Sequence, residues 1–342
     1  MAWWLALCVP FQRLAQVRLA RQALACYDLP GARATFFSAS GNLVFRVEAG
    51  GQRFALRISQ PERGTVEQVR AELAFAADLH QQLHIRTPIA IPGRNGDPVQ
   101  VVPHDHAGTR LAMLFPWMTG NIMGQRPTPS HMERVARAQA RMHAFTVNTR
   151  PAYATLRPVL GAEEVLRWTV PPHRAATLLS EKDRSLMARM GDHLQQLLPR
   201  LLEQSPKALV HFDLQGSNLL FEGDQLGIID LDDCHVAPVL LDMATTLTYT
   251  TTKPDADALR SAWLKGYLSV PGVPVPDTHA LDAAIALIAL REAQRVLEWP
   301  RITTNPWGPA VLETSLHVLR AQGLRMGIGT DPGPGQGRAT TG

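Results

Sequence analysis

Three polar residues within one short stretch constrain this chain more than any other feature. Asp213 stands five residues before Asn218, and Asp230 ends an apolar run twelve residues after that Asn. Apolar segments at 208–211 and 225–230 predict two buried strands, and the Glu-Gly-Asp between them favours a hairpin. A hairpin would bring Asn218 and Asp230 toward one end of the strands, with Asp213 on the loop between them.

The chemistry that needs this arrangement is phosphoryl transfer. A carboxylate must accept the proton of an attacking hydroxyl, and an amide oxygen and a second carboxylate must hold Mg²⁺ on the phosphates. The same residues leave two other interpretations open. A nucleotide-binding pseudoenzyme would keep the site without the reaction, and a metal-dependent hydrolase could use a cluster of His211, Asp213, Asp230, Asp232, Asp233 and His235.

The order H-x-D-x-x-x-x-N followed by I-D-L-x-D resembles the aminoglycoside phosphotransferase and choline kinase superfamily, whose fold is that of a protein kinase. The pattern is closest to the bacterial stress-response kinase (RdoA-like) branch, which the segment at 60–65 also resembles. The resemblance implies that Asp213 is the catalytic base. It also implies that Asn218 and Asp230 are metal ligands, with Asp232 as an outer or second-metal ligand.

Three further positions are interpreted through the same resemblance. Asp242 matches a later Asp of the family and is expected to be a structural anchor. Phe212 stands where the family usually has a small residue, and Gln215 where it often has a second His. Neither departure removes a proton acceptor or a metal ligand, so both bear on substrate and rate rather than on the type of reaction.

The N-terminal third carries the pattern of a small antiparallel sheet. Segments at 34–37, 43–48 and 52–58 alternate in polarity and are rich in aromatic or β-branched residues, as strands are. The turn around Ser40 and Gly41 is expected to lie over the phosphates, where small residues let backbone N–H groups approach anions. A plain hairpin turn would have the same sequence.

Arg57 and Glu72 are predicted to face each other. Arg57 stands where a kinase has the Lys that binds the non-transferred phosphates, and it keeps a permanent cation. The capping box Thr65-x-x-Gln68 predicts a helix that ends near Leu83, and Glu72 lies beside the apolar stripe of that helix. The alternative for Arg57 is an edge-strand residue that faces solvent.

An apolar strand that starts at Leu111 runs into a turn at Gly120. The resemblance implies that this segment is the hinge between two lobes. There, Phe115, Trp117 and Met118 are expected to contact the adenine of the nucleotide.

The predicted fold class is α+β, with a two-lobed protein-kinase-like fold. An N-terminal antiparallel sheet lobe with one helix is assigned to residues 31–118, and a larger, mainly helical C-terminal lobe to residues 119–326. Residues 1–30 are expected to be an N-terminal extension. The Gly- and Pro-rich segment 327–342 is expected to be a disordered tail.

Composition argues against several other classes of protein. A net charge of +4 and a pI near 9.2, without a Lys/Arg-rich block, give no sign of nucleic-acid binding. The apolar start is too short to span a membrane, and three scattered cysteines favour a reducing cytoplasm. The sequence therefore predicts a cytoplasmic ATP- and Mg²⁺-dependent phosphotransferase, monomeric or weakly dimeric. Its acceptor is expected to be a hydroxyl-bearing small molecule, with protein Ser/Thr as the alternative.

Overall fold

The computed structural model describes residues 15–39, 41–60, 64–104, 108–124, 126–161, 177–298 and 308–328. The chain divides into two compact units. The first takes in Met1–Asn121 and Leu220–Asp232, and the second takes in Ile122–Leu219 and Asp233–Gly342.

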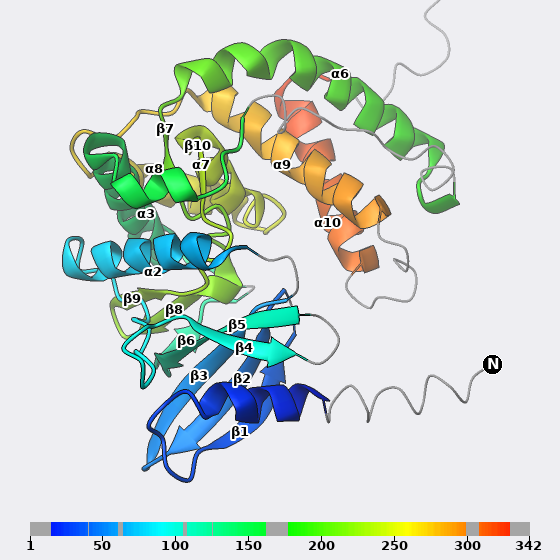
Figure 1. Cartoon of the computed structure of the whole chain (residues 1–342). Coiled ribbons are helices and arrows are strands. Elements are labelled where there is room, and N and C mark those ends of the chain that lie inside the picture. Colours follow the sequence, from blue (N-terminus) through cyan, green and yellow to red (C-terminus); the bar gives the residue numbers. More distant parts are fainter. Residues whose placement is uncertain are drawn as a thin grey trace, which may run out of the picture. The chain divides into compact units, whose positions relative to one another are not determined.

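A five-stranded antiparallel sheet forms the base of the first unit (Figure 1). Its strands follow the spatial order β1 (Arg33–Ser38), β2 (Leu43–Ala49), β3 (Gln52–Ile58), β5 (Gly108–Pro116) and β4 (Gln100–His104). Side chains of a strand point alternately to its two faces. One face buries Phe45, Leu56 and Leu114 against a helix at residues 15–24, drawn in dark blue in Figure 1.

The other face of the sheet packs on α2 (Val66–Gln81), through Met113 and Phe115 of β5 and Val69 of the helix. Because Leu56 and Ile58 are buried on the side of the N-terminal helix, the intervening Arg57 points to the α2 side. Alternation in β3 thus places this cation on the same face as the helix that carries Glu72.

The β8–β9 hairpin also belongs mainly to the first unit. A small sheet has the order β6 (Asn121–Ile122), β8 (Leu219–Glu222) and β9 (Gln225–Ile228). The predicted hairpin of the segments at 208–211 and 225–230 is therefore wrong. A two-residue turn at Gly223 and Asp224 joins β9 to the strand directly before it, and such a turn can only connect immediate neighbours.

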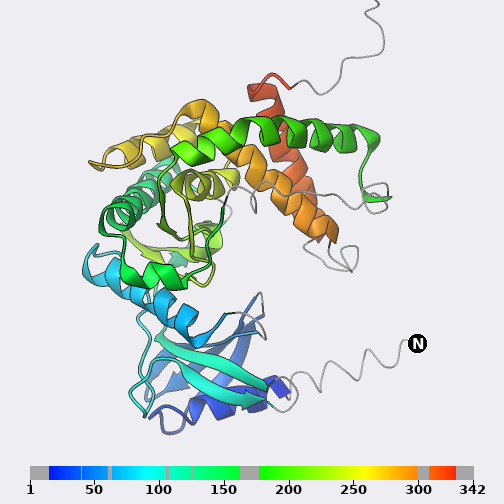
Figure 2. The ribbon, with the colours of Figure 1, turned by 45° about the horizontal axis from the view of Figure 1, so that its top comes forward.

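The second unit is mainly helical (Figures 1 and 2). Its helices are α3 (Pro129–Thr149), α6 (Glu181–Gln204), α7 (Val239–Thr248), α8 (Ala256–Leu268), α9 (Thr278–Glu298) and α10 (Gly308–Arg325), with short 3-10 turns η1 (Ala152–Leu156) and η2 (Gly216–Asn218). The strand predicted at 208–211 is β7 (Lys207–Val210), and it pairs with β10 (His235–Pro238). The expected N-terminal sheet with a helix, followed by a mainly helical region, is confirmed.

Helix α9 forms the centre of this unit. Nearly every side chain from Ala280 to Leu290 is buried, and the helix packs against α6, α7 and α10. A helix that is apolar around its whole circumference belongs in a core. Between Ala280 and Leu290 the single polar residue is Asp282, which is paired with Arg260 of α8, and the other polar residues of α9 lie in its first turn and beyond Leu290.

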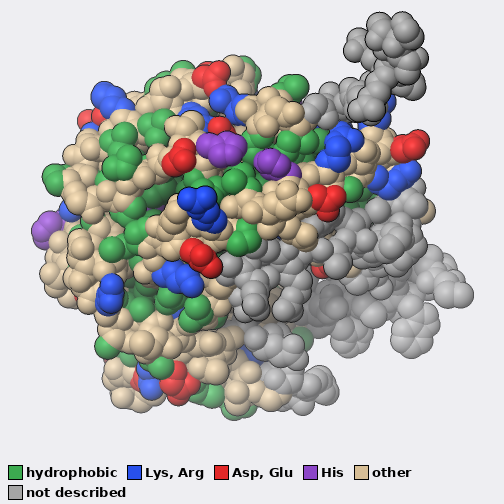
Figure 3. Space-filling model, turned by 90° about the horizontal axis from the view of Figure 1, so that it is seen from above, with side chains coloured by type: hydrophobic (Ala, Val, Ile, Leu, Met, Phe, Trp, Pro, Cys, Tyr) green, Lys and Arg blue, Asp and Glu red, His purple; other side chains and the backbone are tan. Residues whose placement is uncertain are grey.

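Over the described residues, the face drawn in Figure 3 mixes basic and acidic side chains and shows no broad patch of one sign. None of the helices described here is long and apolar enough to cross a membrane.

Candidate functional site

The loop that follows β7 holds Asp213 in a network of N–H donors. The side-chain amide of Gln215 donates to both carboxylate oxygens of Asp213, at 2.9 and 3.1 Å. The amide nitrogen of Asn218 donates to the Asp213 carboxylate and to its backbone carbonyl, both at 2.8 Å. Two of the predicted site residues are therefore brought together, and a departure from the family pattern, Gln215, holds the carboxylate in place.

The orientation of the Asn218 side-chain amide turns its oxygen away from Asp213. Because the nitrogen of its amide donates to Asp213, the Oδ1 atom points away, and within the described part of the chain it accepts a single long hydrogen bond, from Ser217 at 3.3 Å. An amide oxygen in this position has a lone pair for a hard cation such as Mg²⁺.

Burial raises the pKa of Asp213 to about 6, and the hydrogen bond from Gln215 partly opposes this rise. A carboxylate with a pKa near the working pH is an effective general base, because it is ionised and still has a substantial proton affinity. The loop thus provides both the position and the basicity that proton removal requires.

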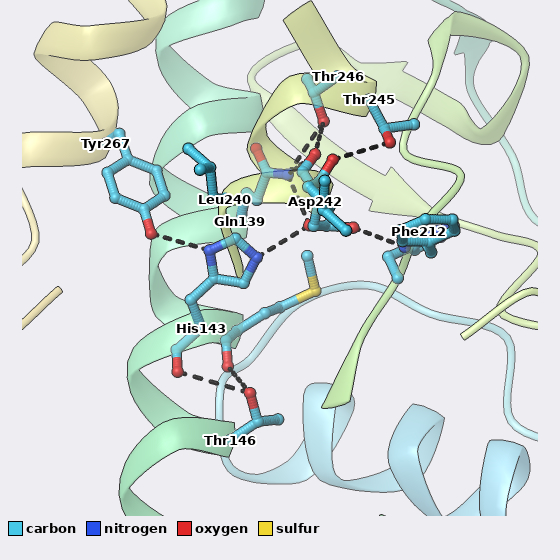
Figure 4. Close-up of polar contacts among 12 residues, drawn as sticks. Gln139, His143, Thr146, Phe212, Leu240, Asp242, Thr245, Thr246 and Tyr267 are labelled. Atoms are coloured by element: carbon cyan, nitrogen blue, oxygen red, sulfur yellow. Dashed lines mark hydrogen bonds and ion pairs between the residues drawn. The ribbon is translucent and has the colours of Figure 1, made fainter. Parts of the chain in front are cut away.

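Asp242, at the start of α7, fixes the backbone of this loop (Figure 4). Its Oδ1 accepts the N–H of Phe212 at 2.5 Å, directly before Asp213. Phe212 has a φ of 64°, in the left-handed region that a bulky residue seldom adopts. The expected structural anchor therefore holds a strained peptide, and this explains why a small residue is usual at the position of Phe212.

Asp242 is itself held by a buried network that the sequence did not reveal. Its Oδ2 accepts from Gln139 at 2.6 Å and lies 2.9 Å from His143 Nε2, whose Nδ1 is 2.8 Å from the hydroxyl of Tyr267 (Figure 4). Burial alone would raise the pKa of Asp242, but the hydrogen bonds from His143 and Gln139 hold it below its usual value. A Gln at 139, on the buried face of α3, was the available signal for this network.

In the first unit, Arg57 and Glu72 form the predicted ion pair, with 2.6 Å between Nη2 and Oε1. Both side chains are at most 10% exposed. The guanidinium lies 5.4 Å from the centre of the Phe115 ring and 4.0 Å from a carboxylate oxygen of Asp230. The solvent-facing alternative for Arg57 is therefore wrong, because the side chain is buried on the α2 side of the sheet.

Asp230 and Asp232, in the same unit, form a pair of carboxylates whose charges repel each other. Burial raises the pKa of Asp230 above its usual value, and the charge of Asp232 raises it further. The Asp230 side chain is still 43% exposed, so solvent moderates this rise and a cation has access to the carboxylate. A divalent ion would relieve the repulsion between the two groups, and their hard oxygens suit Mg²⁺.

Asp232 has a second partner that the sequence analysis missed. Asn42, in the turn between β1 and β2, donates to Asp232 Oδ2 at 2.7 Å, and the Asn is only 8% exposed. In the sequence Asn42 resembles an ordinary turn residue, because Asn is common in turns between strands. In the same turn Gly41 has a φ of 94°, whereas Ser40 lies outside the described residues.

The predicted hinge residues lie where β5 ends. Phe115 packs in the core beside α2, and the N–H of Trp117 already donates to the carbonyl of Arg53, at 3.0 Å. The Trp117 ring makes an edge contact with the exposed Phe37, at 5.3 Å between centroids. A bulge in β1 leaves Phe37 outside the register with β2, between Phe36 and Ser38.

No three His, Cys, Asp or Glu side chains gather as a metal cluster in the described part of the chain.

Comparison with known proteins identifies the family of this chain. The family model described as "Phosphotransferase enzyme family" matches residues 34–283. The serine/threonine protein kinase RdoA of Salmonella typhimurium is 27% identical over 194 residues, which cover 56% of this chain and 55% of that protein. The homoserine kinase of Bradyrhizobium diazoefficiens is 25% identical over 215 residues, 62% of each chain.

The chain therefore spans little more than half the length of the curated relatives it matches. Similarity to solved structures extends further. A microcompartment-associated aminopropanol kinase shares the fold with a TM-score of 0.74 and 22% identity, over 92% of this chain and 99% of that one. Since the family model matches well over half of the chain, this protein belongs to the phosphotransferase enzyme family.

Proposed function

We propose that this protein transfers the γ-phosphate of ATP to the hydroxyl group of a small molecule. The observation that carries the proposal is the state of Asp213, a carboxylate held by the amides of Gln215 and Asn218 with a pKa of about 6. Asp213 orients the acceptor hydroxyl and takes its proton as the oxygen attacks the phosphorus.

The first unit supplies the nucleotide site in this proposal. Arg57, set by Glu72, binds the non-transferred phosphates, and the turn at Gly41 covers them with backbone N–H groups. Phe37 and Trp117 contact the adenine ring. Because the N–H of Trp117 is already bonded, the backbone of Met118 is the better candidate to read the adenine edge.

Asn218 and Asp230 are the proposed Mg²⁺ ligands. The free face of the Asn218 amide oxygen and the repulsion around Asp230 support these roles. When bound, the ion neutralises charge on the phosphates. Asp232 has a different main role in this proposal, since its hydrogen bond from Asn42 ties the phosphate-covering turn to the metal-binding segment.

The proposed setting is a reducing cytoplasm, with the protein as a monomer or weak dimer. Among the described residues, Cys26 and Cys234 form no disulfide, as this compartment favours. A protein Ser/Thr residue remains a second candidate acceptor, and the match to the kinase RdoA supports it.

Thermal unfolding with Mg²⁺ alone, ATP alone and both together tests the nucleotide site. A ligand at a hundredfold excess over its Kd adds about 2.7 kcal/mol to the free energy of unfolding. We expect a shift that needs both components and disappears in Asp230→Asn, whereas Asp213→Asn keeps the shift and loses transfer. Stabilisation by metal alone would favour a hydrolase, and stabilisation by ATP without regard to metal would favour a pseudokinase.

A further inference from the structure

A second-unit pocket lies away from the residues of the proposed phosphotransfer site. Its space, about 340 Å³ with the open mouth included, is bounded by the end of α7 and the turn after it, by the start of α8, and by α9 and α10. None of its described lining residues belongs to the loop that carries Asp213. Thr250 is the one described residue that it shares with a second pocket, which the loop residues Leu214 to Ser217 line.

Two side chains that line this pocket have buried polar atoms without a hydrogen-bond partner. Gln322, on α10, is 1% exposed, and its Oε1 atom accepts no hydrogen bond within the described part of the chain. The side chain of Arg260, on α8, is 13% exposed, and its Nη2 atom donates to none of the described groups. Because unpaired polar atoms in a protein interior are unfavourable, a ligand that pairs with both atoms would be stabilised here.

The turn after α7 adds two hydroxyl groups that can adapt to a ligand. Thr250 and Thr251 each direct a backbone N–H and a hydroxyl at the carbonyl oxygen of Leu247, over distances of 2.8 to 3.2 Å. That oxygen has two lone pairs, fewer than the donors that point at it. Either hydroxyl can therefore turn to a ligand and leave the carbonyl fully paired.

The charges around the pocket favour a neutral ligand over an anion. Arg260 forms an ion pair with Asp282 of α9, and Arg325 of α10 forms one with Asp257 of α8. Each cation of the described lining thus already has a counter-charge. A carboxylate or phosphate would leave water without an unpaired cation to receive it, and that transfer is costly.

The rest of the described lining is apolar and consists of Leu247, Ala256, Ile285 and Ala321. A water molecule can pair with one donor and one acceptor, but it gains nothing from an apolar wall. An organic molecule with a carbonyl oxygen, an N–H group and a short alkyl chain matches the donor, the acceptor and the apolar wall together.

We propose that this pocket binds a small neutral carboxamide. The carbonyl oxygen of the ligand accepts from Arg260 Nη2, its N–H donates to Gln322 Oε1, and its alkyl group packs on Ile285. The proposed site is a binding site separate from phosphotransfer, because none of the residues proposed for ATP, Mg²⁺ or proton removal takes part in it.

Three small probes separate the features of the ligand. Propanamide has the carbonyl and the N–H, N,N-dimethylpropanamide keeps the carbonyl and lacks the N–H, and propanoate carries a charged carboxylate in place of the amide. We would label the δ1 methyl groups of isoleucine in the full chain isotopically and titrate each probe by NMR. Ile285 reports on the pocket, whereas Ile228 of β9, in the first unit, supplies the reference resonance.

We expect propanamide to shift the Ile285 resonance along a saturable curve with a Kd of about 1–10 mM, and to leave Ile228 unchanged. The other two probes should bind at least about tenfold more weakly, because one cannot donate to Gln322 and the other brings an uncompensated charge. Gln322→Leu should weaken propanamide about tenfold and remove its advantage over N,N-dimethylpropanamide. Gln294→Leu is the matched control and should bind like the wild type, since Gln294 pairs with Glu298 near the C-terminal end of α9.

Three results would overturn the inference. The first is the lack of a saturable shift at Ile285 with propanamide up to about 100 mM, which would leave the pocket to water alone. The second is equal or tighter binding of propanoate, and the third is unchanged binding of propanamide in Gln322→Leu. If the methyl spectrum shows that Gln322→Leu is unfolded, Arg260→Lys replaces it, because Lys keeps a cation beside Asp282 and loses the Nη2 donor. Unchanged binding of propanamide in that variant would equally refute the site.

Discussion

Replacing Asp242 with Asn tests how the buried network supports the loop that carries Asp213. The variant keeps the shape of the side chain, and its amide oxygen can still accept the N–H of Phe212. The new NH₂ group, however, replaces the oxygen that accepts from Gln139 and His143. Each of these two donors then meets another donor unless its side chain can rearrange.

The two partners differ in their freedom to rearrange. His143 can change tautomer, accept at Nε2 and donate from Nδ1 to the hydroxyl of Tyr267. Gln139 cannot turn over, because its Oε1 accepts the indole N–H of Trp263 at 3.2 Å and its Nε2 also donates to the Asp242 carbonyl and to Thr246. One buried donor is therefore left opposite a donor, which costs about 1–3 kcal/mol.

Loss of the carboxylate charge also weakens the remaining bond to Phe212 by about 1 kcal/mol. Together these terms predict that Asp242→Asn lowers the free energy of unfolding by about 2–4 kcal/mol, or the melting temperature of the second unit by roughly 5–10 °C. Calorimetry of the wild type and the variant measures the change. Asp192→Asn, on the exposed side of α6, is the control and should stay within about 0.5 kcal/mol. A change below about 1 kcal/mol for Asp242→Asn would refute the idea that Gln139 is locked.

Three other variants test the loop that carries Asp213 and the ion pair of Arg57 with Glu72. Gln215→Leu removes a donor to the ionised carboxylate of Asp213, so the pKa of Asp213, which is about 6, should rise. The acidic limb of the pH profile of kcat/KM should then move to higher pH, and a move to lower pH would contradict this prediction. Arg57→Gln leaves Glu72 buried without its cation and should lower the free energy of unfolding by about 3–5 kcal/mol in urea titrations. Arg57→Lys should lose clearly less stability. Equal losses in the two variants would argue against the ion pair. In Gly216→Ala the added methyl group would lie 2.2 Å from a backbone oxygen, so the loop must move. We expect kcat to fall about a hundredfold with the Kd for ATP unchanged. An unaffected kcat would show that the loop adapts.

Local signals explain what could be predicted from the sequence. The capping box of α2 is present as expected, with Thr65 Oγ1 accepting from the Gln68 N–H and the Gln68 side chain accepting from the Thr65 N–H. Alternation in β3 and the helical spacing of α2 then place Arg57 opposite Glu72. Each of these inferences needs only the period of one element and the chemistry of its ends.

The errors arose where two patterns competed. At the start of α3, Ser130-x-x-Glu133 also has the sequence of a capping box, but the cap is Thr128, followed by Pro129 at the first helical position. Strand pairing failed for a similar reason, because the apolar run Leu219–Glu222 was not recognised as a strand of its own. Hydrophobic character shows that a segment is buried, whereas its partner is set by turn length and by the strands that compete for the same edge.

Backbone conformation at the two key loops lay beyond any sequence pattern. Phe212 and Asp230 both have φ near +65°, and each lies at or directly before a proposed functional carboxylate. A left-handed conformation costs roughly 1–2 kcal/mol in a non-glycine residue, so something else must hold it. For Phe212 that agent is the buried Asp242 bond, which connects residues 30 positions apart in the chain. The conformation of this loop thus depends on a long-range contact, and therefore a motif of eight residues can name the groups of the proposed site without determining how they are held.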